Sequence, residues 1–310
     1  VLAHKRETGS AHGRANGTHA GTRLPLITTA AGCCAVLAWT PQLTGLYGRP
    51  VEIHAIDVGQ GDALAIRTPH GQWVLVDAGP RTPRFDAGRS RVVPYLREHG
   101  ARTLDAVVIT HPDADHIGGV AAVLALVGAR AIIDPGTAAG KPLYLQTMTV
   151  ADSAGVVWFK ARDGRHLDVD GVRLDFLYPA SDSLDGTGDP NDLSVAFRLR
   201  YGRFAALFMG DAPVATENRI VAEYGPRLAA AVLKVGHHGS YTSTSVGLLE
   251  AVRPQVALVS VGRDNRYGHP NPGVMARLLL HRVRVLRTDE HGAVIVRGRK
   301  DGGLTVVTER

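Results

Sequence analysis

The sequence predicts a mixed α/β fold in which two sheets pack together and helices flank them. From Val51 onward, short apolar runs alternate with Gly, Pro and Asp, which is typical of strands joined by tight turns. Helical patterns are spread among these runs, and several of the runs end at an acid or a histidine. A doubly wound nucleotide-binding sheet fits less well, because "DVGQGDA" holds two glycines but no helix follows it.

The composition is that of a folded chain with one large domain and an appendage. It has 310 residues, 45% hydrophobic, and a net charge of +6. That basic excess is compatible with a polyanionic partner, an acidic membrane surface, or solubility alone. Its two cysteines, Cys33 and Cys34, are adjacent, so they form neither a disulfide framework nor a thiolate zinc site. Any bound metal must therefore be held by histidines and carboxylates.

The N-terminal part differs from the rest. Residues 1–23 lack periodicity, which predicts a disordered or truncated segment. Residues 24–48 carry no charge and span about 37 Å as a helix, so they predict a transmembrane helix or an export signal. A buried apolar segment is the alternative. Because basic residues precede this run, we expect residues 51–310 to lie outside the cytoplasm, at the cell membrane.

Individual elements follow from the local patterns. Strands are expected at 51–58, 63–68 and 73–77, a helix at 90–102, and a buried strand at 104–110; residues 116–129 have helical spacing. Further strands are predicted at 131–136, 172–179, 194–202, 204–211, 230–238 and 256–262. Helices are predicted at 143–155 and 215–225, and two closing strands within 292–309.

Four strand ends carry residues that can bind metal, which predicts one site along a single sheet edge. The residues concerned are Asp77; His111, Asp113, Asp115 and His116; Asp211; and His237 with His238. In an extended segment, positions i and i+2 face the same side, so His111 and Asp113 can reach one ion. Asp115 and His116 begin the next helix and point toward a second ion.

Asp211 could bridge the two ions, and a histidine of "GHHGS" could complete the second site. Two divalent ions about 3.5–4 Å apart can generate a hydroxide and hold both oxygens of a displacement. Taken alone, each motif has a structural alternative: a helix cap, a turn or a surface loop. Their joint occurrence in this order favours a metal site, whereas Asp77 fits better as a residue that orients a ligand.

"HPDADHIGG" resembles the His-x-Asp-x-Asp-His variant of the metallo-β-lactamase motif, whose commoner form has histidine in place of Asp113. Together with "DVGQGDA", "VLVDAG", "NDLSVAFRL", "FMGD", "LKVGHHGS" and "VGRDNRYGHP", it looks like the extracytoplasmic C-terminal domain of the ComEC family of competence DNA-uptake channels. The resemblance covers residues 51–310. The family's upstream channel helices and small oligonucleotide-binding-type domain are not found, so we expect a fragment or a divergent single-span relative.

This resemblance implies an αββα sandwich and hydrolysis of phosphodiesters, with DNA as the substrate. Carried over by motif, the metal ligands would be His111, Asp113, Asp115, His116, Asp211 and one of His237 and His238, with His237 taken as the ligand. Asp115, His238 and His269 are then the candidate catalytic residues. The family's isolated histidine before the bridging aspartate is missing, and Asn191 and Asp192 stand at about its place.

The oxygen-rich ligand set shifts the expected pair of divalent ions from Zn toward Mn or Mg, although Zn stays open. Arginines at 81, 84, 89, 91, 263 and 266 could contact DNA phosphates or simply be solvated. Expected partners are DNA, the membrane through residues 24–48, and a competence channel with its uptake machinery. Two other functions remain open: hydrolysis of another ester, such as a phosphocholine ester or a lactone, and guiding DNA without cutting it.

Overall fold

The computed structural model describes residues 48–136, 140–180 and 189–310. The predictions for residues 1–23 and 24–48 fall outside these ranges, apart from Gly48. Within them, no helix combines the length and the apolar character needed to cross a bilayer.

The first sheet has eight strands in the order β17-β16-β1-β2-β3-β6-β7-β8. Its strands are β1 Val51–Ala55, β2 Leu64–Arg67, β3 Trp73–Val76, β6 Ala106–Val108, β7 Ala131–Asp134, β8 Val157–Lys160, β16 Val294–Gly298 and β17 Leu304–Thr308. Pairing is antiparallel from β17 to β3 and parallel from β3 to β8. The parallel half brings successive strand ends to the same edge.

The second sheet has seven strands in the order β15-β14-β13-β12-β11-β10-β9. Its strands are β9 His166–Val169, β10 Val172–Tyr178, β11 Ala196–Tyr201, β12 Phe204–Phe208, β13 Val232–Lys234, β14 Val256–Val259 and β15 Arg284–Arg287. Here too one half is antiparallel and the other, from β12 to β15, is parallel. A separate hairpin pairs β4 Arg81–Thr82 with β5 Phe85–Asp86.

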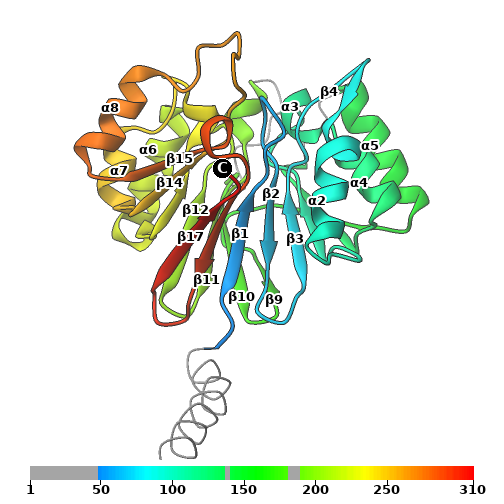
Figure 1. The fold of residues 1–310 in the computed structure, drawn as a ribbon, viewed down its shortest axis with the longest axis horizontal. Helices are drawn as coiled ribbons and strands as arrows, with labels where there is room; N and C mark the ends of the chain where they lie inside the picture. Colours follow the sequence, from blue (N-terminus) through cyan, green and yellow to red (C-terminus); the bar gives the residue numbers. More distant parts are fainter. Residues whose placement is uncertain (1–47, 137–139, 181–188) are drawn as a thin grey trace, which may run out of the picture. The chain divides into compact units, whose positions relative to one another are not determined.

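Helices cover the outer faces of both sheets (Figure 1). Over the first sheet lie η1 Gly88–Val92, α2 Val93–Glu98, α3 Ala114–Ile117, α4 Val120–Leu126 and α5 Pro142–Ser153. Over the second lie α6 Val214–Tyr224, α7 Val246–Val252 and α8 Pro272–Leu280. Short turns of helix occur at η2 Pro190–Leu193, η3 Gly225–Leu228, η4 Gly236–Gly239 and α9 Thr288–His291.

Three apolar layers hold this arrangement together. Along β3, Val74 and Val76 pack into the cluster between the sheets, whereas Trp73 and Leu75 pack against helices. Side chains of a strand alternate between faces, so a strand buried on both sides must be apolar throughout. The predicted order of helix, sheet, sheet and helix is confirmed.

The structure also corrects several local predictions. The helical spacing over 116–129 yields two short helices, α3 and α4, separated by Gly118 and Gly119. A Cβ on Gly119 would lie 2.3 Å from the carbonyl oxygen of Ala78, so the glycine is needed for this close approach. Strands β8, β9 and β15 and helices α7 and α8 are present although the sequence patterns did not indicate them.

Candidate metal centre

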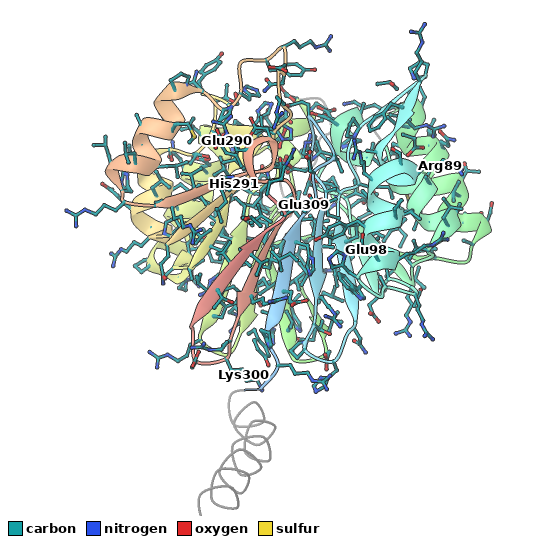
Figure 2. The ribbon with its side chains drawn as sticks, viewed as in Figure 1. Arg89, Glu98, Glu290, His291, Lys300 and Glu309 are labelled. Atoms are coloured by element: carbon teal, nitrogen blue, oxygen red, sulfur yellow. The ribbon has the colours of Figure 1, made fainter. Side chains whose placement is uncertain are left out.

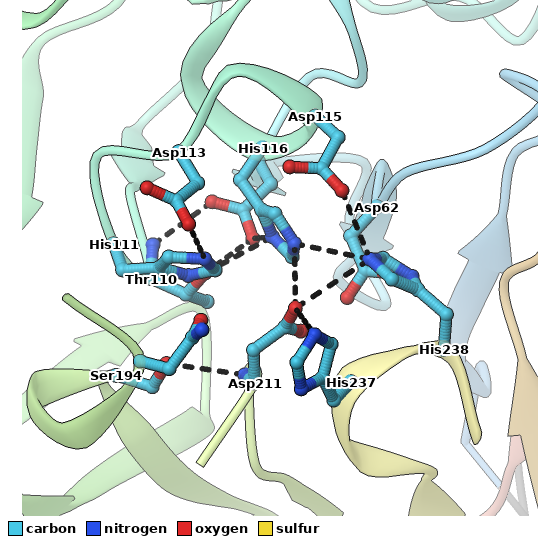
Figure 3. A network of polar contacts seen from close by, with 12 residues as sticks. Asp62, Thr110, His111, Asp113, Asp115, His116, Ser194, Asp211, His237 and His238 are labelled. Atoms are coloured by element: carbon cyan, nitrogen blue, oxygen red, sulfur yellow. Dashed lines mark hydrogen bonds and ion pairs between the residues drawn. The ribbon is translucent and has the colours of Figure 1, made fainter. Parts of the chain in front are cut away.

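Strands β3, β6, β12 and β13 each lead into a segment that carries a candidate ligand. Asp77 follows β3, His111 follows β6, Asp211 follows β12, and His238 follows β13. Their side chains converge in one buried network (Figure 3). The predicted meeting of distant strand ends is therefore realised in the fold.

Asp77 anchors the ligand-bearing loop after β6. Its carboxylate accepts hydrogen bonds from the Thr110 backbone N–H (2.8 Å), the Thr110 hydroxyl (2.6 Å) and Nδ1 of His116 (2.8 Å). Because the Thr110 hydroxyl donates to Asp77, its oxygen can accept from Nδ1 of His111, which lies 3.0 Å away. Asp77 is fully buried, and its contacts orient histidines.

Three imidazoles consequently present the same nitrogen to the centre. His111 and His116 have their Nδ1 atoms held as described, and Nδ1 of His238 donates to the Ser260 carbonyl at 3.0 Å. When Nδ1 carries the proton, the lone pair lies on Nε2. All three Nε2 atoms are thus prepared as metal ligands, which is the role that such outer contacts have in known metal sites.

Carboxylates complete the cluster. Oδ2 of Asp211 lies 3.2 Å from Nε2 of His116 and 3.5 Å from Nε2 of His238. Oδ2 of Asp115 lies 3.4 Å from the same His238 nitrogen. Nε2 of His111 and Oδ1 of Asp211 are buried and have no hydrogen-bond partner among the described residues. Buried polar atoms left in this state are costly unless a cation occupies the space between them.

The pKa values of the three histidines also fit a cation site. Burial lowers the pKa of His111 to about 4, so this imidazole is neutral near pH 7. Burial opposes charge on His238, but Asp211 and Asp62 raise its pKa to about 9. For His116, Asp211 and Asp77 overcome burial and raise the pKa well above its usual value. In the metal-free protein, the extra protons on His116 and His238 balance the carboxylates, and a divalent ion would take the place of these protons.

Two sets of three residues place ligand atoms within 4.8 Å of one another: His111, His116 and Asp211, and Asp62, His116 and His238. The donor set, the aligned Nε2 atoms and the unpartnered buried atoms therefore fit a divalent metal. Asp113 belongs to neither set. Its carboxylate contacts the Lys141 ammonium and lies 3.7 Å from Nε2 of His111.

The two histidines of "GHHGS" occupy different positions. His238 is buried in the cluster, whereas the His237 side chain is 29% exposed and its Nε2 lies 3.7 Å from Oδ2 of Asp211. Both have positive φ, 48° and 53°, which is rare for residues other than glycine. The sequence predicts His237 as the ligand and His238 as a hydrogen-bond donor, but this geometry favours the opposite assignment.

The other predicted residues lie around the cluster. Asn191 and Asp192 are in η2, and neither side chain contacts a candidate ligand in the described part of the chain. Their neighbour Ser194 does, because its hydroxyl accepts from the Asp211 backbone N–H at 3.1 Å. His269 lies beside His237, with ring centroids 5.9 Å apart.

The sequence reasoning missed a buried ion pair behind the cluster. Asp62 and Lys234 are almost fully buried, with Nζ and Oδ2 2.7 Å apart, and Oδ1 of Asp62 lies 3.2 Å from Nδ1 of His238. Burial raises the pKa of Asp62, but Lys234 and His238 outweigh it and hold that pKa well below its usual value. Asp62 therefore faces the side of His238 that points away from Asp211. The signals were an aspartate in "GQGD" and a lysine inside the apolar run "AAVLKVG".

A model of the Metallo-beta-lactamase superfamily matches residues 56–263. Over 284 residues the chain is 29% identical to "ComE operon protein 3" of Bacillus subtilis (strain 168), covering 87% of this chain and 36% of that protein. It is 34% identical over 238 residues to "Competence protein ComA" of Neisseria gonorrhoeae, covering 77% of this chain and 31% of that protein. The chain thus spans about a third of the length of these curated relatives.

Among solved structures, the metallo-beta-lactamase fold protein YhfI from Bacillus subtilis matches with a TM-score of 0.56 and 13% identity. The match covers 81% of this chain and 100% of YhfI, and at this identity it supports the fold alone. The resemblance to competence proteins of the ComEC family, predicted from the motifs, is confirmed.

Proposed function

The chain belongs to the metallo-beta-lactamase superfamily, and from that premise we propose that it is a metal-dependent phosphodiesterase that cleaves DNA. One observation carries the proposal: His111, His116 and Asp211 converge in a buried cluster, and Nε2 of His111 and Oδ1 of Asp211 have no hydrogen-bond partner among the described residues. The names of its relatives support DNA as the substrate, since one is called "Competence protein ComA" and another "Recombination protein 2".

In this proposal, His111, His116, His238, Asp211 and Asp115 hold two divalent ions. When bound, such ions supply a nucleophile from water at neutral pH and polarise a phosphoryl oxygen. Other residues act around these ligands.

Asp77, Thr110 and the Ser260 carbonyl keep protons on the Nδ1 atoms, so that every Nε2 lone pair stays directed inward. His237 is partly exposed beside Asp211, where it is placed to hold a proton at Nε2 for the leaving oxygen. Burial lowers the pKa of His269, so its ring is neutral near pH 7 and can serve as a hydrogen-bonding partner of the substrate.

The test is hydrolysis by the full 310-residue chain with Mn, with Zn and with chelator. A labelled oligodeoxynucleotide and a chromogenic phosphodiester are the substrates, and a lactone and a phosphocholine ester are the comparators. We expect metal-dependent cleavage of the oligodeoxynucleotide and the chromogenic phosphodiester, no turnover of the lactone, and slower turnover of the phosphocholine ester, itself a phosphodiester, than of the oligodeoxynucleotide. Asp211→Asn should reduce cleavage of the oligodeoxynucleotide by more than about 100-fold, because it removes a ligand rather than a supporting contact.

Asp192→Asn is the matched control. Asp192 is an exposed acid two residues before Ser194, and its side chain does not contact the candidate ligands. Metal-loaded protein that leaves the oligodeoxynucleotide and the chromogenic phosphodiester intact would refute the proposal. Full activity of the Asp211→Asn variant would also refute the assigned site. Attachment to the membrane through residues 24–48 is a further part of the proposal and rests on the absence of charge in that run. Cooperation with DNA-uptake machinery is another part, supported by the name "Competence protein ComA".

A further inference from the structure

A cleft of about 680 Å³ opens beside Asp115. One wall is formed by the β4–β5 hairpin and the other by the loop 262–267, which precedes α8. Figure 1 shows β4 and this loop at the same end of the molecule as α3, the helix that carries Asp115. The cleft thus adjoins the candidate metal centre, and its volume is in the range of small-ligand sites.

The lining of the cleft is positively charged. Five arginines and three aspartates line it, and Asp57 and Arg310 neutralise each other at 2.9 Å. Asp289 is paired with Arg287, which lies outside the lining, at 2.6 Å. In the described part of the chain, three lining arginines form no ion pair with a carboxylate: Arg91, Arg263 and Arg266. Unpaired guanidinium groups of this kind are well suited to phosphate.

Not every arginine suggested by the sequence belongs to this surface. Arg84 and Arg89 do not line the cleft but a second hollow, which shares the hairpin residues Arg81, Thr82 and Phe85 with it. Figure 2 shows Arg89 on the side of the molecule formed by the helices that cover the first sheet. The structure therefore separates the cleft arginines from neighbours that are close to them only in sequence.

The cleft also has an aromatic face. Phe85 is 38% exposed and Tyr267 is 54% exposed, although large aromatic side chains are usually buried. The Arg266 guanidinium lies over the Tyr267 ring, 5.1 Å from its centroid, and donates a hydrogen bond to its hydroxyl at 3.0 Å. We call Arg266 and Tyr267 the platform.

The platform is connected to the candidate centre through a row of rings. Tyr267 stacks on His269 at 5.9 Å and 15°. His269 meets His237 edge-on at 5.9 Å and 64°, and His237 lies beside Asp211. The row leads from the platform toward Asp211, and the platform lines the same cleft as Asp115.

We propose that the cleft binds one unpaired nucleotide of a single-stranded nucleic acid, with its base on the platform and its phosphate at Arg91 and Arg263. This rests on the proposed function, because it specifies the strand presented to the metal centre. Bases stack on aromatic rings and guanidinium planes only when they are unpaired and splayed out. In a duplex the faces of the bases are covered, so the platform selects single strands or frayed ends.

The test measures binding by the 310-residue chain in chelator, so that cleavage cannot interfere. Three fluorescein-labelled probes of equal length are compared by anisotropy: a mixed-sequence single strand, a duplex, and a single strand of abasic residues. The abasic strand keeps the phosphates and lacks the bases. Wild-type protein should bind the normal single strand tighter than either of the other probes.

Tyr267→Ala should weaken binding of the normal strand roughly 5- to 100-fold and leave the abasic strand unchanged. Arg266→Gln should weaken binding of both strands, because it removes a charge as well as a stacking surface. Phe159→Ala on β8 and Arg219→Gln on α6 are the controls, since both residues are exposed and lie outside the cleft.

Equal wild-type affinity for normal and abasic strands would overturn the proposal, as would a Tyr267→Ala variant that binds like Phe159→Ala. Hydrolysis is measured separately on the same preparations with Mn. Base-dependent binding lost in Tyr267→Ala supports the subsite even if no phosphodiester is cleaved. Metal-dependent cleavage without such binding overturns the subsite and leaves the proposed function standing.

Discussion

Replacing Asp77 by asparagine tests whether contacts behind the ligands prepare the metal site. Asp77 accepts three hydrogen bonds, from two Thr110 groups and from Nδ1 of His116. An asparagine has one acceptor oxygen, so its NH₂ group must face one of these donors. If that group donates to Nδ1 of His116, the imidazole proton moves to Nε2, where it occupies the lone pair that would bind the ion.

The expected loss is 10- to 100-fold in metal affinity, or about 1.4–2.8 kcal/mol, as is typical for supporting contacts of metal-bound histidines. A matched control exists in Asp134, another fully buried acid, which accepts from Tyr144, Trp158 and the Gly136 backbone N–H and lies outside the cluster. Asp134→Asn should lower stability without changing metal affinity.

Competition titration with a chromophoric chelator gives the affinity for Mn and Zn, and urea unfolding gives the stability of each variant. Asp77→Asn that binds metal like wild type would refute the tautomer argument. Equal losses of affinity in both variants would show that the effect comes from general destabilisation.

Three further changes test the fold around the site. Lys234→Met leaves the buried Asp62 carboxylate without its cation, so the free energy of unfolding, measured in urea, should fall by about 3–5 kcal/mol. Adding Asp62→Asn should restore part of this loss. No recovery in the double variant would contradict the pairing. His54, Arg297 and Arg67 lower the pKa of Glu52 to about 2, below its unfolded value of 4.5, so its contribution is present above pH 4.5 and lost toward pH 2. Glu52→Gln should thus be less stable than wild type at pH 7 but not near pH 2, and a pH-independent difference would exclude this origin. Gly119→Ala places a Cβ 2.3 Å from the Ala78 carbonyl oxygen and should lower the free energy of unfolding by about 1–3 kcal/mol. Gly247→Ala in α7 meets open space and should raise it by about 0.5–1 kcal/mol. Similar melting temperatures for the two variants would contradict the steric argument.

The sequence located most of the residues that converge in the buried cluster because these candidate ligands follow buried strands, and parallel strands deliver their ends to one edge. Asp211 and His111 are far apart in the chain, yet each follows an apolar run, "FAALFM" before Asp211 and "AVVI" before His111. Asp62 was missed because its partner Lys234 lies 172 positions away, and local patterns do not show which buried charges will meet. The two histidines of "GHHGS" could not be distinguished, because alternation applies to extended backbone and both have positive φ.

The elements that were missed have equally local reasons. In β15, "RVLR", two arginines flank only two apolar residues, and β15 lies at the edge of its sheet. In β8 every side chain is exposed, so burial does not explain its apolar sequence "VWFK". Strand patterns are most readable where a strand is buried, so the inner strands of both sheets were located, whereas the edge strands β8, β9 and β15 were not. The other edge strand, β17, was located because it forms a hairpin with β16 around the "KDGG" turn.

The structure also changes what Asp113 implies about the metal. A carboxylate in place of an imidazole makes a site harder only if it is available to the ion. Here the Asp113 carboxylate contacts Lys141, so a cation of the protein already balances part of its charge. The three-residue set that includes His111 consists of two imidazoles and one carboxylate, from His111, His116 and Asp211. This combination suits Zn as well as Mn. The metal preference of this centre therefore depends on whether Lys141 or the ion holds Asp113, a competition that the sequence alone gave no means to see.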